Sequence, residues 1–359
     1  MKKSIIVRGP ILSQSGYGEH ARLVLRSLRQ REDELDIFVV PTGWGETGWL
    51  CDLNDERAWM DDRIMATNKR LESKVPFDVS VQVTIPNEWE KMAPINIGVT
   101  AGIESNKVSP VWLEKSNYMD KVVTISEHSK AGFTNTSFEG FNKETGEKMR
   151  LKMETDIEVV GYPVKSFSSD NEIELDLDFD FNYLTVSQWG PRKNLDNLIR
   201  WFVEENHDQE VGLIVKTSIK NNSVVDRQYV QSLINNTVAS CPDAKDRKCK
   251  VYLLHGDLSE AEMHAVYKHE KVKCLISLSH GEGFGLPLFE AAYSGLPIIA
   301  PGWSGQCDFL FAPPKTKSKN KKKNSPKPYF AKVDFTMGPV PDFAVWPGVI
   351  EKDTMWCFP

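Results

Sequence analysis

Short apolar runs alternate with amphipathic stretches along the first half of the chain. Residues 4–8 form the first apolar run and predict a strand, and a loop that contains Gly9, Gly16 and Gly18 follows it. Apolar residues then recur at helical spacing at Ala21, Val24, Leu25 and Leu28. The next apolar run, residues 35–40, predicts a second strand. This order of strand, glycine loop, helix and strand is typical of a parallel α/β unit.

The same alternation continues to the end of the patterned sequence. In the first half we expect further strands at residues 77–83, 95–100, 122–125 and 157–160. In the second half we expect strands at residues 183–186, 211–215, 251–254, 274–278 and 297–300, with helical stretches between them. The spacing of Ser259 and Glu262 fits a capping box and predicts a helix start. The pattern therefore predicts a second parallel sheet.

The length of the chain indicates two domains. A chain of 359 residues exceeds what one hydrophobic core usually organises. An acidic segment, residues 168–180, separates the two patterned halves, and we expect the interdomain hinge there. We therefore predict one Rossmann-like domain over residues 1–167 and another over residues 181–359. The second would carry a lysine-rich insertion at residues 315–327.

Composition narrows the class of protein. The chain is 40% hydrophobic and 26% charged, which is the ordinary range of globular proteins, and no apolar run is long enough to span a membrane. The first residues lack the apolar core of a signal peptide. Six scattered cysteines form no C-x-x-C pair, so we expect reduced thiols in a cytoplasmic protein.

Charge adds one local exception. The net charge of −6 disfavours nucleic acid or an anionic membrane as a general partner. Residues 315–327, however, contain seven lysines and no acidic residue. A solvated loop and a docking patch for a polyanionic acceptor or a lipid surface both fit this segment. Peripheral contact with a membrane and a modified-DNA acceptor therefore stay open as alternatives.

The stretch at residues 277–300, SLSHGEGFGLPLFEAAYSGLPIIA, carries the strongest chemical signal. A strand runs into three glycines, and Pro287 fits the first position of a helix. Free N–H groups at such a helix start bind phosphate or sugar oxygens, and glycines let a ligand approach the backbone. Glu282 in the loop and Glu290 in the helix could each accept paired hydroxyl groups of a sugar. A glycine-rich turn with two solvated glutamates is the alternative.

The Glu282-to-Glu290 spacing, with Gly-Phe-Gly-Leu-Pro between them, resembles the E-x7-E signature of retaining glycosyltransferases of family four, which have the GT-B fold of two facing Rossmann-like domains. The resemblance implies that Glu282 contacts the donor sugar and that Glu290 contacts the nucleotide ribose. It also implies that the backbone near Gly283, Phe284, Gly285 and Leu286 binds the donor.

The segment at residues 187–195 is similar to the family segment that carries an arginine and a lysine for the diphosphate. Lys193 fits the lysine position and is implied to act in catalysis. Gln188 stands at the arginine position, and Arg192 is the candidate to replace that charge in donor binding. A solvated Arg-Lys pair at a helix end is the alternative.

Three segments of the first half resemble family segments that line the cleft on the side opposite the bound donor. Residues 15–22 resemble the N-terminal glycine loop, which implies donor contacts from Gly16 and Gly18 and places Tyr17 on the acceptor side. Residues 98–104 nominate Glu104 as a catalytic-site residue, with a structural cap or salt bridge as the alternative. Residues 123–129 nominate Ser126 and His128 for the acceptor side, although a histidine at a helix start is more often structural.

The resemblance implies transfer of a sugar from a nucleotide diphosphate donor to an acceptor, with retention of anomeric configuration. A glycan or a lipid-linked sugar is the expected acceptor, and neither a metal nor another cofactor is expected. A catalytically silent sugar-nucleotide or polyanion-binding protein and a nucleotide-sugar epimerase are the alternative functions. Besides Gln188, two features depart from the family: the lysine-rich segment, and the lack of an evident final helix that returns to the first domain.

Overall fold

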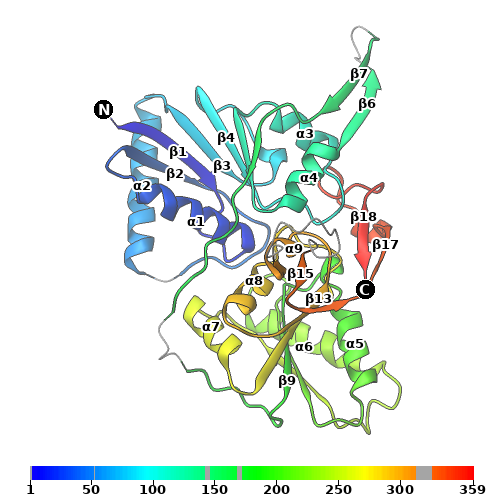
Figure 1. Cartoon of the computed structure of the whole chain (residues 1–359). Helices are drawn as coiled ribbons and strands as arrows, with labels where there is room; N and C mark the ends of the chain where they lie inside the picture. The colour runs from blue at the N-terminus through cyan, green and yellow to red at the C-terminus, as the bar shows by residue number, and fades with distance from the viewer. Residues whose placement is uncertain (1, 52, 142–145, 168–171, 313–325) are drawn as a thin grey trace. The chain divides into compact units, whose positions relative to one another are not determined.

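The computed structural model describes residues 2–51, 53–141, 146–167, 172–312 and 326–359. The chain divides into two compact units. Unit 1 comprises Met1–Tyr162 and Pro339–Met355, and unit 2 comprises Pro163–Gly338 and Trp356–Pro359. Each unit contains one six-stranded sheet with helices (Figure 1).

Unit 1 is built on a parallel sheet with the strand order β2-β1-β3-β4-β5-β8. The strands of this sheet are β1 (Lys3–Gly9), β2 (Leu35–Pro41), β3 (Val79–Val83), β4 (Ile95–Thr100), β5 (Lys121–Thr124) and β8 (Ile157–Val159). Its helical segments are α1 (Gly16–Arg29), α2 (Asp55–Glu72), η1 (Pro86–Glu88), α3 (Pro110–Ser116), α4 (Glu127–Asn135) and η4 (Asp342–Ala344). An antiparallel hairpin, β6 (Ser137–Phe141) with β7 (Lys148–Lys152), completes the unit.

Unit 2 repeats this plan with the strand order β11-β10-β9-β12-β13-β16, again all parallel. Its sheet contains β9 (Asn182–Val186), β10 (Gly212–Lys216), β11 (Lys250–Leu254), β12 (Val272–Ile276), β13 (Ile298–Pro301) and β16 (Ala331–Val333). Its helical segments are η2 (Pro191–Lys193), α5 (Leu195–Glu205), α6 (Val224–Ala239), α7 (Glu260–Lys268), α8 (Leu286–Tyr293) and α9 (Cys307–Leu310). Two small pairs, β14 (Phe311–Ala312) with β15 (Lys327–Pro328) and β17 (Thr336–Pro339) with β18 (Met355–Phe358), lie outside the main sheet.

Alternating side chains on strand β10 show how the sheet of unit 2 is covered. Leu213 and Val215 belong to the core cluster that α5 and α6 complete. Ile214 belongs to a second cluster, which α7 and α8 complete. Since successive side chains of a strand point to opposite faces, helices cover both faces of this sheet. The predicted parallel α/β architecture is confirmed.

Local signals in the sequence explain several element boundaries. Ser259 and Glu262 form the predicted capping box at the start of α7. The buried face of α5 consists of the predicted residues Leu195, Leu198, Ile199, Phe202 and Val203. Burial of such a face contributes roughly 1.5–3 kcal/mol for each large apolar side chain.

In both sheets the strand order reverses beside the first strand of the sheet, β1 in unit 1 and β9 in unit 2. In unit 1 the chain passes from β1 to the edge strand β2 and then continues on the other side of β1 with β3. In unit 2 it passes from β9 through β10 to β11 and then returns to the other side of β9 with β12. The carboxyl ends of the two strands that flank such a switch point form the usual ligand crevice of an open α/β sheet. Loops after β1, β3, β9 and β12 are therefore the first places to look for a site.

The division of the chain differs from the predicted domains in two places. The change from unit 1 to unit 2 falls at Tyr162–Pro163, ahead of the predicted hinge at residues 168–180, of which residues 168–171 lie outside the described part. Residues Pro339–Met355 were expected in the second domain but belong to unit 1. Asn87 in unit 1 donates its amide to the carbonyl of Gly348 in this segment. Ser109 donates its hydroxyl to the carboxylate of Glu351, which also lies in this segment.

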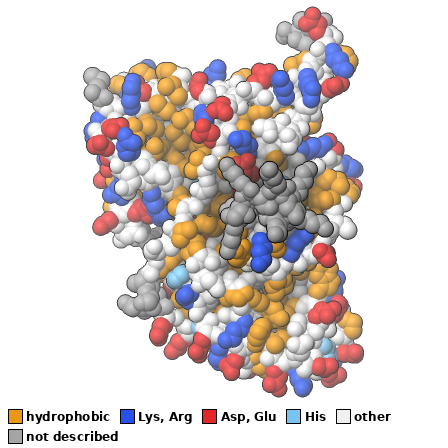
Figure 2. Space-filling view, in the orientation of Figure 1, with side chains coloured by type: hydrophobic (Ala, Val, Ile, Leu, Met, Phe, Trp, Pro, Cys, Tyr) orange, Lys and Arg blue, Asp and Glu red, His pale blue; other side chains and the backbone are white. Residues whose placement is uncertain are grey.

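The lysine-rich insertion lies largely outside the described residues, which resume at Pro326. On the face drawn in Figure 2, acidic and basic side chains of the described residues are interspersed.

Among the described residues, no helix is both long enough and apolar enough to cross a membrane. All six cysteines are free thiols.

Candidate functional site

The loop between β12 and α8 contains Glu282 and ends at a helix start. Gly285 precedes α8 with a φ of +89°, a left-handed conformation that disfavours residues with a Cβ atom. No side chain among the described residues caps the first turn of α8, and Pro287 stands at its start. The helix start therefore presents backbone N–H groups at the carboxyl edge of the sheet, as an anion site requires.

A second loop, after β13, fixes the backbone of Glu282. The hydroxyl of Ser304 accepts a hydrogen bond from the Glu282 N–H at 3.0 Å. The N–H of Gly305 donates to the Glu282 carbonyl at 2.9 Å. A Cβ atom at Gly305 would lie only 2.0 Å from the carbonyl oxygen of Gly283, so the two loops pack backbone against backbone. Ser304 and Gly305 therefore position Glu282.

Two cations from the β9–α5 loop meet the carboxylate of Glu282. Lys193 Nζ donates to Glu282 Oε1 at 2.5 Å, and Arg192 donates to Glu282 Oε2 at 3.1 Å. Glu282 is 8% exposed, so these contacts form largely out of water. Lys193 and Arg192 belong to the short helix η2, which Asn194 ends with a left-handed φ of +56°. The family resemblance implied that both Lys193 and Glu282 bind the donor, and the structure brings these two side chains into contact.

The charge state of Glu282 follows from these neighbours. Burial by itself raises the pKa of a carboxyl group, but the charges of Lys193 and Arg192 outweigh burial and lower the pKa of Glu282 to about 2. Glu282 is therefore ionised at neutral pH. The cluster of Arg192, Lys193 and Glu282 carries a net charge of about +1, which favours an anionic ligand beside it.

Main-chain contacts join the two loops of this cluster. The N–H of His280 donates to the carbonyl of Arg192 at 2.8 Å, and Arg192 returns a hydrogen bond to the carbonyl of Gly281 at 2.6 Å. Asn194 donates its amide to the carbonyl of Leu278 at 3.2 Å. Since these loops follow the adjacent strands β9 and β12, the cluster lies at the switch point of the sheet.

Other predicted donor residues in unit 2 have defined packing. The hydroxyl of Tyr267 donates to Glu290 Oε2 at 3.0 Å, and burial together with this carboxylate raises the pKa of Tyr267 well above its usual value. The ring of Phe284 is buried against Phe289 and Phe309. Gln188 donates to the carbonyl of Ile219 at 2.5 Å. The side chain of Gln188 is therefore bound to Ile219, whereas Arg192 and Lys193 contact Glu282.

The glycine loop of unit 1 follows β1, at the switch point of the first sheet. Ser15 caps α1 by accepting from the Gly18 N–H at 3.0 Å. A Cβ atom at Gly18 would lie 2.0 Å from the Ser13 carbonyl oxygen, whereas Gly16 has open space around it. The hydroxyl of Tyr17 lies 2.8 Å from Thr100 Oγ1, at the end of β4. Gly18 is thus required for close packing.

The three predicted acceptor-side residues, Tyr17, Ser126 and His128, are all at least partly buried. Burial, with a contribution from Glu104, raises the pKa of Tyr17. Ser126 caps α4 by accepting from the Ser129 N–H at 3.1 Å. His128 Nε2 lies 3.0 Å from the Ser105 carbonyl oxygen, and burial lowers the pKa of His128 to about 4. The hydroxyl of Ser126 therefore has a structural role as a helix cap, and His128 is neutral near pH 7.

Sequence reasoning missed His20, on the first turn of α1. It is 4% exposed, and its ring meets Tyr162 edge to face with the ring centroids 5.1 Å apart. Its Nδ1 atom has no hydrogen-bond partner among the described residues. Burial lowers the pKa of His20 to about 4. A polar residue on the mainly apolar face of α1 was the only available signal.

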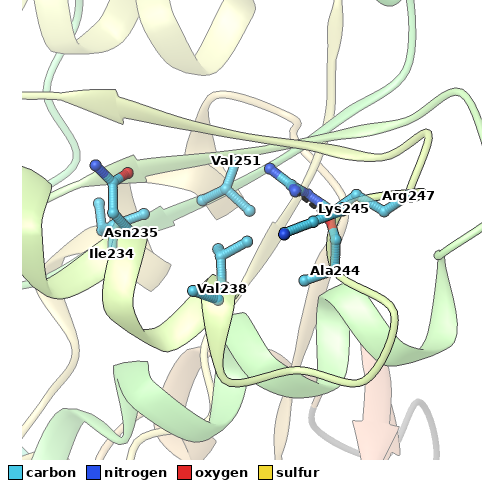
Figure 3. Close-up of a pocket in the computed structure, with 8 residues that line it drawn as sticks. Ile234, Asn235, Val238, Ala244, Lys245, Arg247 and Val251 are labelled. Carbon is cyan, nitrogen blue, oxygen red and sulfur yellow. Dashed lines mark hydrogen bonds between the residues drawn. The ribbon is translucent and has the colours of Figure 1, made fainter.

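A separate cavity of about 260 Å³ lies away from this cluster (Figure 3). Its lining comes from α6, from the loop before β11 and from β11 itself, and consists of Ile234, Asn235, Val238, Ala239, Ala244, Lys245, Arg247 and Val251. The loop residues precede β11 and so lie at the amino edge of the sheet. Lys193 and Glu282 follow the carboxyl ends of their strands, so this cavity is not part of the candidate site. No group of three or more potential metal-ligating side chains was found among the described residues.

Comparison with known proteins identifies the fold. No family model and no curated protein sequence matches the chain. Among solved structures, the apo form of the lipopolysaccharide outer core galactosyltransferase WaaB is 14% identical, with 87% of this chain and 84% of that one covered and a TM-score of 0.50. Sucrose-phosphate synthase of Thermosynechococcus elongatus is 13% identical over 86% of this chain and 84% of that one, with a TM-score of 0.51.

A UDP-forming α,α-trehalose-phosphate synthase of Burkholderia xenovorans is 11% identical, covers 86% of each chain and has a TM-score of 0.52. The chain therefore has the two-domain Rossmann-like GT-B fold of these glycosyltransferases. At such low identities the similarity concerns the fold.

Proposed function

We propose that this protein is a glycosyltransferase that uses a nucleotide diphosphate sugar as donor. The observation that carries the proposal is the cluster of Arg192, Lys193 and Glu282 beside the start of α8. It combines two cations, an ionised carboxylate and helix N–H groups at the switch point of a GT-B sheet. A diphosphate needs the cations and the N–H groups, and a sugar hydroxyl needs the carboxylate.

In the proposed reaction, the bond between the anomeric carbon and the diphosphate oxygen breaks, and the acceptor oxygen forms a bond to that carbon. The acceptor proton passes to a phosphate oxygen of the leaving group, and the product retains the anomeric configuration. Lys193, Arg192 and the N–H groups of α8 stabilise the negative charge that grows on the diphosphate. Glu282 accepts hydrogen bonds from the donor sugar, and Glu290 accepts them from the ribose.

Glu282 also keeps the two cations in place before the donor arrives. Lys193 and Arg192 already lie within hydrogen-bond distance of a carboxylate, so little side-chain ordering remains when the diphosphate binds. We expect phosphate oxygens to take over part of these contacts. Tyr17 and His128 remain the candidates for the acceptor side and Glu104 remains the candidate for the catalytic site, with a glycan or a lipid-linked sugar as acceptor.

Release of the nucleoside diphosphate tests this proposal. The protein is incubated with UDP-, GDP- and ADP-sugars, with and without glycan and lipid-linked acceptors, and the freed diphosphate is quantified. A transferase releases one diphosphate for each sugar that joins the acceptor. Tight donor binding without acceptor-dependent release would instead support a silent binding protein, and conversion of the donor to its epimer would support an epimerase.

A further inference from the structure

His280 lies two residues before Glu282 and joins the candidate site to strand β18. Its Nδ1 atom lies 2.7 Å from the carbonyl oxygen of Cys357, and the N–H of Cys357 donates to the carbonyl of His280 at 3.0 Å. A carbonyl oxygen only accepts hydrogen bonds, so Nδ1 of His280 carries the proton. The side chain and the backbone of His280 are thus both bound to the same residue of β18.

Aromatic side chains on either side of Cys357 hold the ring of His280. Trp356 stacks on it with an interplanar angle of 13° and a centroid separation of 5.2 Å, and the ring of Phe358 lies 4.6 Å away. Phe358 can reach this position because Gly338, on the neighbouring strand β17, has no Cβ atom, which would lie 2.9 Å from the Phe358 ring. His280 is 8% exposed as a result.

The other side of His280 faces the cations of the candidate site. The N–H of His280 donates to the carbonyl of Arg192 at 2.8 Å, and the next residue, Gly281, accepts from the Arg192 guanidinium at 2.6 Å. A displacement of the His280 backbone therefore moves the anchor of Arg192 and the start of the loop that carries Glu282. A 1 Å displacement of a binding group is enough to weaken a positioned contact strongly.

The geometry points to His280 as a positioning residue for diphosphate binding, held by Cys357 and the aromatic pair of β18. His280 itself does not touch the donor in this inference. It fixes the backbone from which Arg192 and Glu282 project, so its loss weakens the contribution of the diphosphate to binding and leaves the contribution of the nucleoside. This inference rests on the proposed function, because it assumes that Arg192 and Lys193 bind a diphosphate.

Two substitutions of similar chemistry separate this role from simple packing. In His280→Asn the amide nitrogen falls close to the position of Nδ1 and can still donate to the Cys357 carbonyl. In His280→Gln the amide lies one methylene further out and misses it. Trp356→Phe serves as a third variant, because it keeps an aromatic ring for stacking and removes the five-membered ring of the indole, whose N–H has no hydrogen-bond partner among the described residues.

The experiment measures dissociation constants by calorimetry for UDP, GDP and ADP and for the matching nucleosides. The quantity of interest is the ratio of the nucleoside constant to the diphosphate constant, for the base that the parent protein binds. We expect His280→Gln to lower this ratio about tenfold, with the nucleoside constant within about twofold of the parent. His280→Asn and Trp356→Phe should retain a parent-like ratio.

The outcomes separate this inference from the proposed function. Equal ratios for the parent, the Asn variant and the Gln variant would overturn the role of His280, and so would equal losses in Asn and Gln. If the parent itself binds no diphosphate better than its nucleoside, the proposed function fails instead. Thermal unfolding of each variant confirms that the ratios compare folded proteins.

Discussion

The Nζ atom of Lys193 lies 2.5 Å from Oε1 of Glu282, although 89 residues separate the two in sequence. The loops that carry them follow the neighbouring strands β9 and β12. Glu282 is ionised because Lys193 and Arg192 outweigh its burial. The contact therefore holds two cations and a carboxylate at one point before a ligand binds.

Replacement of Glu282 by Gln should separate donor binding from sugar transfer. The variant keeps the side-chain size but loses the charge that offsets Lys193 and Arg192, so the free energy of unfolding should fall by roughly 3 kcal/mol. Binding of a nucleoside diphosphate should be retained or tightened, because its phosphates supply the missing negative charge. Acceptor-dependent release should fall at least about tenfold. Weaker diphosphate binding together with parent-like turnover would contradict these roles.

Acid should destabilise unit 1 through His20. The pKa of His20 is lowered by burial to about 4, so between about pH 6.5 and pH 4 the unfolded chain binds a proton that the folded chain does not. Stability is therefore lost as the pH falls through this range, by about 2 kcal/mol at pH 5.

The variant His20→Phe should abolish that part of the loss, as measured by urea unfolding at pH 7 and pH 5. His207→Gln is the control, because hydrogen bonds to Asp243 and Asp208 raise the pKa of this partly buried histidine. Stability gained from a raised pKa is present at low pH and is lost as the pH rises, so His207 contributes none of the acid loss. An unchanged difference between pH 7 and pH 5 in His20→Phe would refute the role of His20.

A methyl group at Gly305 should displace the loop that carries Glu282. The new Cβ atom would lie 2.0 Å from the Gly283 carbonyl oxygen, and backbone cannot move aside as a side-chain end can. We expect Gly305→Ala to cost about 1–3 kcal/mol of stability and to weaken diphosphate binding. Gly140→Ala, on the hairpin of unit 1 with open space around it, is the matched control. Similar behaviour of the two variants would show that the loops do not depend on this packing.

The variant Glu290→Gln should weaken nucleoside binding and leave the fold intact. Gln can still accept the hydrogen bond from Tyr267, but it is a poorer acceptor for the two ribose hydroxyls. We expect calorimetry to show weaker binding of the nucleoside and of its diphosphate by the same factor. Tyr267→Phe removes only the internal donor, so it should affect stability more than binding. Parent-like affinity in folded Glu290→Gln would exclude Glu290 from the ribose site.

Hydrophobic periodicity predicted the two parallel sheets, and the glycines and proline predicted the loop between β12 and α8. The run at residues 277–300 gives a strand, glycines and a helix start in consecutive residues, so local signals were sufficient there. The resemblance to a known family implied that Lys193 binds the diphosphate and that Glu282 binds the donor sugar, but their mutual contact required the structure. Arg192 was a candidate for donor binding from the sequence, whereas its contacts with Glu282 and with the Gly281 carbonyl required the structure.

Other parts of the site could not be predicted because they depend on backbone contacts between distant residues. Ser304 binds the main chain of Glu282 through its hydroxyl and Gly305 through its N–H, and no local pattern links these two residues to Glu282. The contact of His280 with Cys357 spans 77 residues and depends on where β18 returns to unit 2. The assignment of Pro339–Met355 to unit 1 likewise depends on tertiary contacts, such as that of Asn87 with Gly348.

The proposed function depends most directly on binding of the donor diphosphate by Lys193 and Arg192. The most direct test is a calorimetric comparison of a nucleoside diphosphate with its nucleoside, for the parent, Lys193→Ala and Arg192→Ala. We predict that Lys193→Ala weakens the diphosphate by roughly 1.5–3 kcal/mol more than the nucleoside, as for a hydrogen bond to a charged group, and that Arg192→Ala shows a smaller difference of the same sign. Equal losses for the two ligands, or no loss for either, would contradict the account.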